Sequence, residues 1–420
     1  MENIRIGIFG AGRGIDLAGC CLMLGAQVVA VCDNNPDRME AGIARLIRDS
    51  KGLYKEVTKY DDFDKFLEHP MDAVILANNF YQHAPFAIKC FKKNLHVMCE
   101  CISNGTMKEG VELVEAFEKS QSIYMLAENY PQKKHNREMK RLARSGKLGK
   151  IIYAEGEYNH PVSEWDTNFT KNAKYFPNHW RHFIPPTYYI THSLGPVMNI
   201  TGATPTKVSA FAAFVPPADD VPSAKYCGDA AANITTLNDD GSTFRVVACS
   251  RYGASHSSWR VCGTKGQAEN PRGMGEKIML RYSPWETPEG FPTESLYEPA
   301  WNDPDEAKIM ASGHGGGDYI TTRSFLQCVK EGKQPSHPFD IYSATVMSSV
   351  AILGFRSILE TKIYDIPDFR KEEDKALWRN DDLTPFWGDN GEAPTLPCCS
   401  HPDYKPSEKN MELYFKELEK

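Results

Sequence analysis

The spacing of apolar residues in the first third of the chain alternates between strand-like and helix-like segments. Ile4, Ile6 and Ile8 alternate with polar or small residues and lead into a glycine-rich turn. The apolar-rich segment 15–24 follows as a predicted helix. Further strands are predicted at 27–31, 73–77 and 95–99. Because strands that alternate with helices form parallel sheets, residues 1–127 are predicted to be a doubly wound α/β domain.

Beyond residue 150 the pattern becomes strand-rich, with few helical stretches until late in the chain. Strands are predicted at 151–158, 207–215, 230–237, 243–249 and 277–282. Two helical segments, 317–331 and 340–361, are expected to pack behind this sheet or on the first domain. Residues 128–366 are therefore predicted to be a substrate-binding α+β domain with a large open, mostly antiparallel sheet. Residues 367–420 are polar and Pro-rich and predict a C-terminal extension, with Trp378, Phe386 and Trp387 as apolar anchors.

Composition narrows the class of protein. A chain of 420 residues exceeds one ordinary hydrophobic core, which agrees with two domains plus an extension. The net charge of −7 and the absence of a Lys/Arg run argue against nucleic-acid binding. We see no secretory leader and no apolar span of ~20 residues, so neither export nor membrane insertion is expected. The 12 cysteines lack CxxC pairs, as reduced thiols of a cytoplasmic protein would.

A dinucleotide site is predicted where the first strand meets the first helix. The turn reads Gly10-Ala11-Gly12-Arg13-Gly14, with GxGxG rather than GxGxxG spacing. Backbone N–H groups of such a turn approach a pyrophosphate at the helix N-terminus. Asp33 follows about 20 residues on, where a carboxylate binds the ribose diol and favours NAD over NADP. These features predict a Rossmann domain that binds NAD, although Asp33 could instead cap the helix that follows it.

Two later segments, 78–84 and 94–100, resemble the TPxxxHxxxA and GKHVxxEKP segments of the Gfo/Idh/MocA oxidoreductase family. The likeness spans roughly residues 3–360. It implies a Rossmann domain followed by an open antiparallel sheet, and it implies further cofactor-binding residues: Asn78, Asn79, His83, Glu100 and Asn129.

In the family's dehydrogenases the Lys of EKP helps to move a proton off the substrate hydroxyl. Here Cys101 follows Glu100, and a thiol with a pKa near ~8.5 is a poorer partner for an alkoxide. Cys101 is either inert packing or a polar contact near the nicotinamide.

A branch of the family that also lacks this lysine resembles the chain more closely, namely the NAD-dependent glycoside hydrolases of family 109. The shared segments are 127–129, 154–160, 180–181, 189–197, 263–266, 313–316 and 340–342. The most specific is Thr191-His192-Ser193-Leu194-Gly195-Pro196. A tyrosine that the branch places before GTKG has no clear counterpart, since Ser255 or His256 falls there. The resemblance implies a small-molecule glycoside, cleaved through transient oxidation by bound NAD.

The resemblance also indicates site residues. His192 is the candidate for the C3 hydroxyl proton, and Tyr189 lies three residues earlier. Tyr158 and His160 are two apart on a strand and therefore share a face. The catalytic candidates are His192, Tyr189 and Tyr158. The substrate-binding candidates are Glu128, His160, Arg181, Lys171, Lys174, His256 and His314. No His/Cys cluster predicts a metal site.

Each of these residues also has an ordinary structural explanation. His192 could cap the Gly195–Pro196 turn, and Tyr158 or Tyr189 could be core. Glu128 could pair only with Lys133 or Arg137, His314 could mark a flexible loop, and Lys171 and Lys174 could be solvated. The alternative functions are an NAD-dependent sugar or polyol dehydrogenase that uses His192 as its proton relay, and a non-catalytic sensor. A homo-oligomer that buries the open sheet face is also expected.

Overall fold

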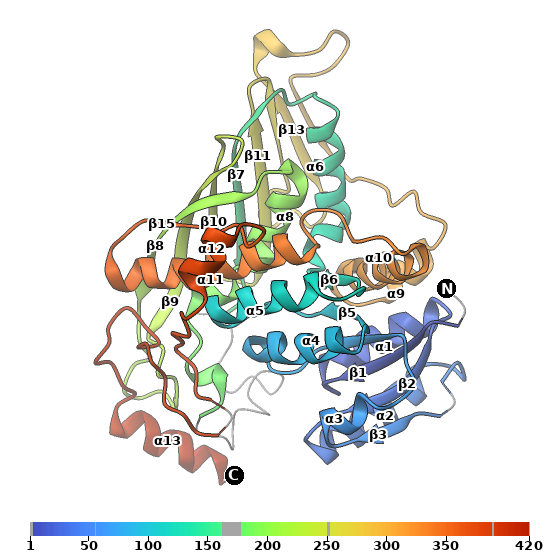
Figure 1. The fold of residues 1–420 in the computed structure, drawn as a ribbon. Coiled ribbons are helices and arrows are strands. Elements are labelled where there is room, and N and C mark those ends of the chain that lie inside the picture. Colours follow the sequence, from blue (N-terminus) through green and yellow to red (C-terminus); the bar gives the residue numbers. More distant parts are fainter. Residues whose placement is uncertain (1–2, 55, 162–177, 250–252, 389, 420) are drawn as a thin grey trace.

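The computed structural model describes residues 3–54, 56–161, 178–249, 253–388 and 390–419. Its first domain is built on a six-stranded sheet of order β3-β2-β1-β4-β5-β6, in which every pairing is parallel (Figure 1). The strands are β1 (Arg5–Phe9), β2 (Gln27–Cys32), β3 (Thr58–Tyr60), β4 (Ala73–Leu76), β5 (His96–Cys99) and β6 (Tyr124–Leu126). This is the predicted Rossmann-like domain.

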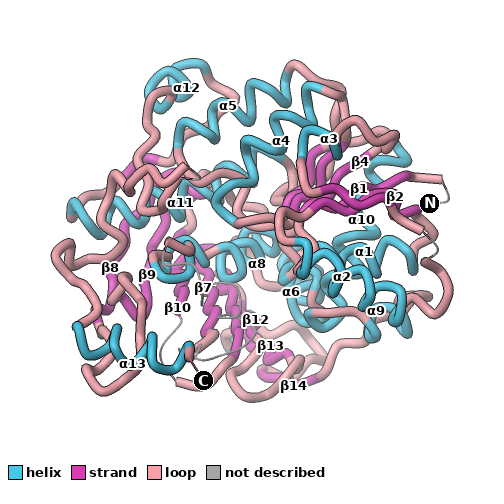
Figure 2. Tube along the Cα trace, turned by 90° about the horizontal axis from the view of Figure 1, so that it is seen from below, coloured by secondary structure: helices cyan, strands magenta, loops and turns pink. Residues whose placement is uncertain are grey.

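Helices cover both faces of this sheet, with α4 and α5 on one side and α1 and α2 on the other (Figure 2). Their bounds are α1 (Arg13–Met23), α2 (Pro36–Asp49), α3 (Phe63–Phe66), α4 (His83–Lys92) and α5 (Met107–Glu118). The next helix, α6 (Lys134–Arg144), packs instead on the second domain. A strand covered on both faces has no polar side, which explains the unbroken apolar run of β4, whose four residues are all fully buried.

The second domain is built on a nine-stranded sheet of order β14-β13-β12-β11-β7-β10-β9-β8-β15. Its pairings are antiparallel except for the parallel pair β7–β10, as the predicted, mostly antiparallel sheet requires. The strands are β7 (Ile151–Asn159), β8 (Pro205–Phe214), β9 (Asp229–Asn238), β10 (Thr243–Cys249), β11 (His256–Gly263), β12 (Gly266–Glu269), β13 (Ile278–Tyr282), β14 (Glu294–Tyr297) and β15 (Tyr364–Asp365). The fold class is confirmed.

The later helices follow β7 along the chain. They are α8 (Thr191–Thr201), α9 (Glu306–Ala311), α10 (Gly317–Glu331), α11 (Ile341–Glu360), α12 (Glu372–Trp378) and α13 (Glu408–Leu418). Helix α11 packs on the second sheet, where Ser357 Oγ accepts from the Ala210 amide. Helix α10 instead packs on α1, and its Phe325 and Leu326 join the core of the first sheet. Each late helix thus takes one of the two expected places.

Helix α11 contradicts the expectation that the chain contains no apolar span of ~20 residues. The helix has 20 residues, and an 18-residue window within it has a mean hydropathy of 1.3, so it is long and apolar enough to cross a membrane. However, 83% of its apolar window is buried inside the protein, as in the core helix of a folded domain.

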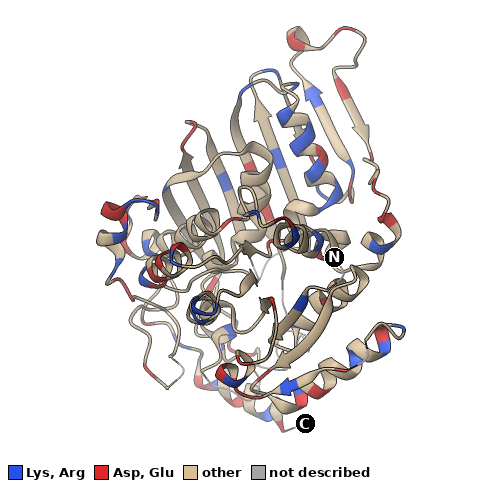
Figure 3. Ribbon diagram, turned by 45° about the vertical axis from the view of Figure 1, so that its right-hand side comes forward, with Lys and Arg blue, Asp and Glu red and all other residues tan. Residues whose placement is uncertain are grey.

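Charged side chains of both signs are interspersed over both domains (Figure 3).

The C-terminal extension is more structured than its composition predicts, since it contains α12 and α13. Ion pairs join α12 to α5, with Lys375 Nζ 2.7 Å from Glu118 Oε2. Of the three expected anchors, Phe386 is the most buried, at 1% exposed, and stacks on Tyr81 with ring centroids 4.8 Å apart. The extension thereby packs close to the segment after β4.

Candidate active site

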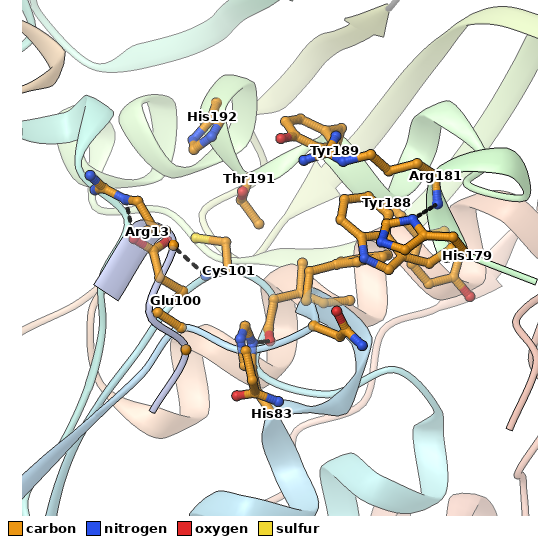
Figure 4. Close-up of a pocket in the computed structure, with 18 of the residues that line it drawn as sticks. Arg13, His83, Glu100, Cys101, His179, Arg181, Tyr188, Tyr189, Thr191 and His192 are labelled. Atoms are coloured by element: carbon orange, nitrogen blue, oxygen red, sulfur yellow. Dashed lines mark hydrogen bonds and ion pairs between the residues drawn. The ribbon is translucent and has the colours of Figure 1, made fainter. Parts of the chain in front are cut away.

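One cavity of about 250 Å³ lies at the carboxyl ends of the parallel strands, between the two domains (Figure 4). The first domain lines it with Gly10, Gly12, Arg13, Arg38, Ala77, Asn78, Asn79, Phe80, His83, Glu100, Cys101 and Ile102. The second lines it with His179, Trp180, Arg181, Tyr188, Tyr189, Thr191 and His192. The fold therefore brings predicted cofactor residues and predicted catalytic residues to one space, as expected at the carboxyl edge of an open α/β sheet.

The three glycines of the first turn have three different roles. Gly10 has φ +99°, and a Cβ there would collide with the Ala77 carbonyl. A Cβ on Gly12 would meet only Arg38 Cδ, at 3.9 Å, so the backbone is open to a ligand. A Cβ on Gly14 would lie 2.6 Å from Ile8 Cγ2, so this glycine allows α1 to pack closely on β1. These are the roles that a dinucleotide-binding turn needs.

Asp33 holds this turn to the following loop. Its carboxylate, 2% exposed, accepts from the Ala11 amide and from the Asn35 amide, both at 2.8 Å. The cap of α2 is Asn35, whose side chain accepts from the Arg38 amide at 3.0 Å. The alternative that Asp33 caps this helix is therefore wrong.

Two buried amide oxygens indicate that the cavity region suits a polar cofactor. Asn78 Oδ1 and Asn129 Oδ1 are both buried and have no hydrogen-bond partner among the described residues. Buried acceptors are usually satisfied, so each is a place for a ligand donor. Together with the open Gly12 backbone, they fit an NAD molecule at the predicted place.

Arg13 connects the glycine turn to the second domain. Its Nε donates to Glu100 Oε1 at 2.8 Å, and its two terminal nitrogens donate to Asp318 at 2.7 and 2.5 Å. Asp318, 1% exposed, also accepts from Asn129 Nδ2 at 2.7 Å and from His314 Nδ1 at 2.9 Å. Burial opposes its ionisation, but Arg13 and His314 outweigh that effect and hold the pKa of Asp318 well below its usual range. Asp318 is therefore a carboxylate.

His192 is the centre of the catalytic side. Its Nδ1 lies 2.9 and 3.0 Å from the two carboxylate oxygens of Glu128, which is fully buried. Glu128 also accepts from the Cys101 thiol at 3.2 Å and from the Tyr130 amide at 3.2 Å. Burial opposes the ionisation of Glu128, but His192 in particular outweighs it, so that the pKa of Glu128 is lowered.

The Cys101 thiol is neutral. Burial raises its pKa well above the ordinary value, and the charges of Glu128 and Glu100 add to this effect. Cys101 is thus a polar contact and not inert packing. Within the described residues, Glu128 forms no ion pair with Lys133 or Arg137, because His192 and Cys101 occupy its oxygens.

Aromatic rings surround His192. The ring centroid of Tyr130 lies 4.4 Å from that of His192, and the centroids of Tyr158 and Tyr189 lie at 4.9 and 5.9 Å. Tyr158 also contacts His160, which directly follows the end of β7, with ring centroids 5.5 Å apart. Burial raises the pKa of Tyr158, and the neighbouring Tyr130 and Tyr189 contribute further. Tyr158 is therefore a protonated phenol.

The structure resolves the alternative for His192. The residue lies inside α8 and contacts Glu128, so it does not cap the Gly195–Pro196 turn.

Of the predicted basic residues, Arg181 lines the cavity with its guanidinium 4.2 Å from the Trp180 ring. Lys171 and Lys174 lie outside the described residues.

The structure corrects the prediction that His256 lies at the substrate site. In the β11–β7 register Ser257 faces Tyr158, and His256 faces Asn159. Side chains alternate along a strand, so His256 lies on the opposite side of the sheet from Tyr158. There its Nε2 is 3.1 Å from Glu157 Oε1. The structure does not bring His256 to the cavity.

Sequence reasoning missed several residues of this region. Arg38 lines the cavity, five residues after Asp33 in the first turn of α2. Tyr130 directly follows Glu128 and Asn129, and Asp318 lies only four residues after His314. These spacings were readable signals, whereas nothing in the sequence linked Asp318 to Arg13.

Comparison with known proteins agrees with this geometry. Residues 4–128 match the model of the oxidoreductase family with an NAD-binding Rossmann fold, Gfo/Idh/MocA. Residues 245–376 match the C-terminal domain of glycosyl hydrolase 109. A glycosyl hydrolase family 109 protein of Saccharopolyspora erythraea is 25% identical over 413 residues, covering 88% of this chain and 84% of its own. An alpha-N-acetylgalactosaminidase of Shewanella oneidensis is 22% identical over 407 residues, covering 88% and 86%.

Among solved structures, levoglucosan dehydrogenase in complex with NADH and L-sorbose superimposes with a TM-score of 0.70 at 16% identity, covering 88% of this chain and 100% of that chain. The fold and the cavity therefore define a two-domain protein with an NAD-binding Rossmann domain. More particularly, its first domain is similar to the Rossmann domain of the Gfo/Idh/MocA oxidoreductases, and its residues 245–376 are similar to the C-terminal domain of glycosyl hydrolase 109. The expected resemblance and the cofactor NAD are thus confirmed.

Proposed function

We propose that this chain is an NAD-dependent glycosidase that cleaves a glycoside with no net redox change. The steps are oxidation of the sugar C3 hydroxyl, elimination of the aglycone, addition of water and reduction of C3. NAD held at the Gly10–Gly14 turn would supply the hydride acceptor for the first step and the hydride donor for the last. The observation that carries the proposal is the Glu128–His192 pair, because it lies at the same cavity as the glycine turn.

His192 takes the C3 hydroxyl proton. Glu128 occupies its Nδ1, which leaves Nε2 for a substrate hydroxyl. An ionised Glu128 stabilises the imidazolium that forms when the proton arrives. Cys101 donates to the same carboxylate and supplies no positive charge, so the proton relay depends on the histidine.

The remaining side chains bind and orient the sugar. Tyr158 is a protonated phenol beside His192 and suits a hydrogen bond to an oxygen that becomes negative at C3 after loss of the C2 proton. Arg181 offers guanidinium donors at the cavity wall. Because one relative is named as an alpha-N-acetylgalactosaminidase, an aryl α-N-acetylgalactosaminide is the first substrate to test.

The alternative is an NAD-dependent sugar or polyol dehydrogenase, since the same His192–Glu128 pair can relay a hydroxyl proton during simple oxidation. Purified protein is incubated with aryl glycosides, and both phenol and NADH are followed. Catalytic phenol release without added NAD and without net NADH is the expected result. Stoichiometric NADH from free sugars without phenol would favour the dehydrogenase, and neither signal would favour a sensor.

A second measurement examines the elimination. Turnover in deuterium oxide is expected to place deuterium at C2 of the product sugar, because the C2 proton exchanges with solvent in the intermediate. Product without label at C2 would exclude this route even if phenol were released.

A further inference from the structure

The C-terminal extension contacts both domains beside the cavity, through two neighbouring residues, Phe386 and Trp387. Phe386, 1% exposed, packs its ring on Tyr81 of the first domain and on Tyr188 of the second, with centroids 4.8 and 5.1 Å away. The Trp387 carbonyl accepts from the Tyr81 hydroxyl at 3.2 Å, and the Trp387 ring lies 6.4 Å from that of Phe183 in the second domain. One short segment thus joins the two domains.

The joined surfaces form an aromatic wall of the cavity, made by Phe80, Trp180 and Tyr188. Phe80 belongs to the first domain and Trp180 to the second, and their ring centroids are 4.6 Å apart. Phe386 lies behind this wall, 5.3 Å from Phe80. It is not among the described residues that line the cavity, so it acts on the cavity only through the rings of the wall.

The aromatic wall is close to the predicted cofactor site. Gly12 and Arg38 of the first domain line the same cavity as the wall. His179 directly precedes Trp180 and lies with Tyr188 at one end of the cavity (Figure 4). Burial lowers the pKa of His179 to about 3, and the charge of Arg38 contributes to the shift, which places the two side chains within electrostatic reach. The second-domain side of the wall therefore lies near residues that would hold the nucleotide.

We propose that Phe386 and Trp387 hold the two domains together at the aromatic wall and thereby slow both the entry and the release of NAD. The inference concerns the cofactor site and does not depend on the glycosidase reaction. It suits that reaction, because a cycle that ends with NAD in its starting state needs no exchange of cofactor, whereas a dehydrogenase must release NADH in every turnover. Both residues lie beyond residue 376, where the similarity to the family 109 domain ends.

A contact of this kind has a distinct kinetic signature. If the domains must part before NAD enters or leaves, weakening a contact that does not touch NAD raises the association and dissociation rate constants by the same factor. The Kd then stays nearly constant. Loss of a direct contact to NAD instead raises the dissociation rate constant and the Kd together.

The test uses Phe386→Leu in the full-length protein. Because the ring loses three aromatic neighbours, both rate constants are expected to rise about 10- to 100-fold, while the Kd changes less than about threefold. Protein loaded with radiolabelled NAD and chased with excess unlabelled NAD gives the dissociation rate constant. Mixing labelled NAD with cofactor-free protein gives the association rate constant.

A second variant, Tyr81→Phe, keeps the ring and removes only the hydroxyl that donates to the Trp387 carbonyl. It is expected to raise both rate constants about 2- to 10-fold, as the loss of one hydrogen bond would. This variant tests the inference even if Phe386→Leu does not fold.

The matched control is Phe369→Leu. Phe369 is also a buried phenylalanine of the extension, 2% exposed, but it packs on α5, where a Cβ on Gly110 would lie 2.7 Å from its ring. Urea unfolding should show a loss of stability similar to that of Phe386→Leu, with both rate constants unchanged.

Three results would overturn the inference and leave the proposed function standing. They are NAD exchange at the original rate in both test variants, a Kd that rises in proportion to the dissociation rate constant, and equally fast exchange in the Phe369→Leu control. If the unaltered protein binds no NAD, the inference and the proposed function fail together.

Discussion

The cofactor side and the catalytic side of the cavity are assembled over different distances along the chain. Gly10, Gly12 and Asp33 come from one strand–turn–helix–strand unit, and the Ala11–Asp33 bond spans 22 positions. On the catalytic side Glu128 meets His192 across 64 positions. The difference teaches that the first side is a local motif, whereas the second forms only when the segment after β6 packs against α8. Substitutions on the two sides should therefore produce different defects.

The largest effect is expected on the catalytic side. His192→Ala removes the group that accepts the C3 hydroxyl proton, so kcat should fall about 1000-fold, within the range of general base catalysis. Bound NAD should be unchanged, because the glycine turn is intact. Kinetics with an aryl glycoside and the absorbance of NAD released on denaturation measure the two quantities. A variant that keeps its turnover would remove His192 from the mechanism.

The converse defect is expected on the cofactor side. Asp33→Ala removes the carboxylate that holds the Ala11 and Asn35 amides and that we propose binds the ribose. Loss of hydrogen bonds to a charged group should raise the Kd for NAD about 10- to 100-fold. Titration of cofactor-free protein followed by fluorescence measures it, and excess NAD should restore most of the turnover. Unchanged affinity would contradict the comparison between the two sides.

A smaller effect is expected at Lys133, which lies close to the catalytic side. Its Nζ is 3.9 Å from the centroid of the Tyr130 ring. Burial lowers its pKa from 10.5 to about 8, with Glu276 and Glu128 opposing part of the shift. Between these pH values the unfolded chain binds the proton that the folded one has released, so Lys133 makes the free energy of unfolding rise with pH. In Lys133→Met this contribution should vanish. Urea unfolding of both proteins at pH 7.5 and 9.5 measures the difference, and parallel pH profiles would disprove it.

The smallest effect is expected at His256. Because His256 faces Glu157 on the outer side of the second sheet, His256→Asn should change kcat and KM by less than about twofold, as ordinary surface substitutions do. Steady-state kinetics beside the unaltered protein measures this. A large rise in KM would return His256 to the substrate site.

Much of the fold was readable because its pattern is local. The strands from Gln27 and Ala73 and the helix Gly317–Glu331 begin where the apolar spacing places them. The short strands β12, β14 and β15 were missed, because segments of two to four residues show too little alternation to stand out. The helices of the extension were missed for a different reason, since α13 is largely polar and has only two buried residues, Asn410 and Tyr414.

The sequence by itself determined the cofactor side, because a strand, a glycine turn and an acidic residue at a fixed spacing fold as one unit. Only the tertiary structure decided that Glu128 binds His192 and Cys101, that Asp318 joins Arg13 to His314, and that His256 faces away. Contacts between distant segments depend on how whole sheets and helices pack. The side of a strand on which a residue lies depends on a register that a shift of one position reverses.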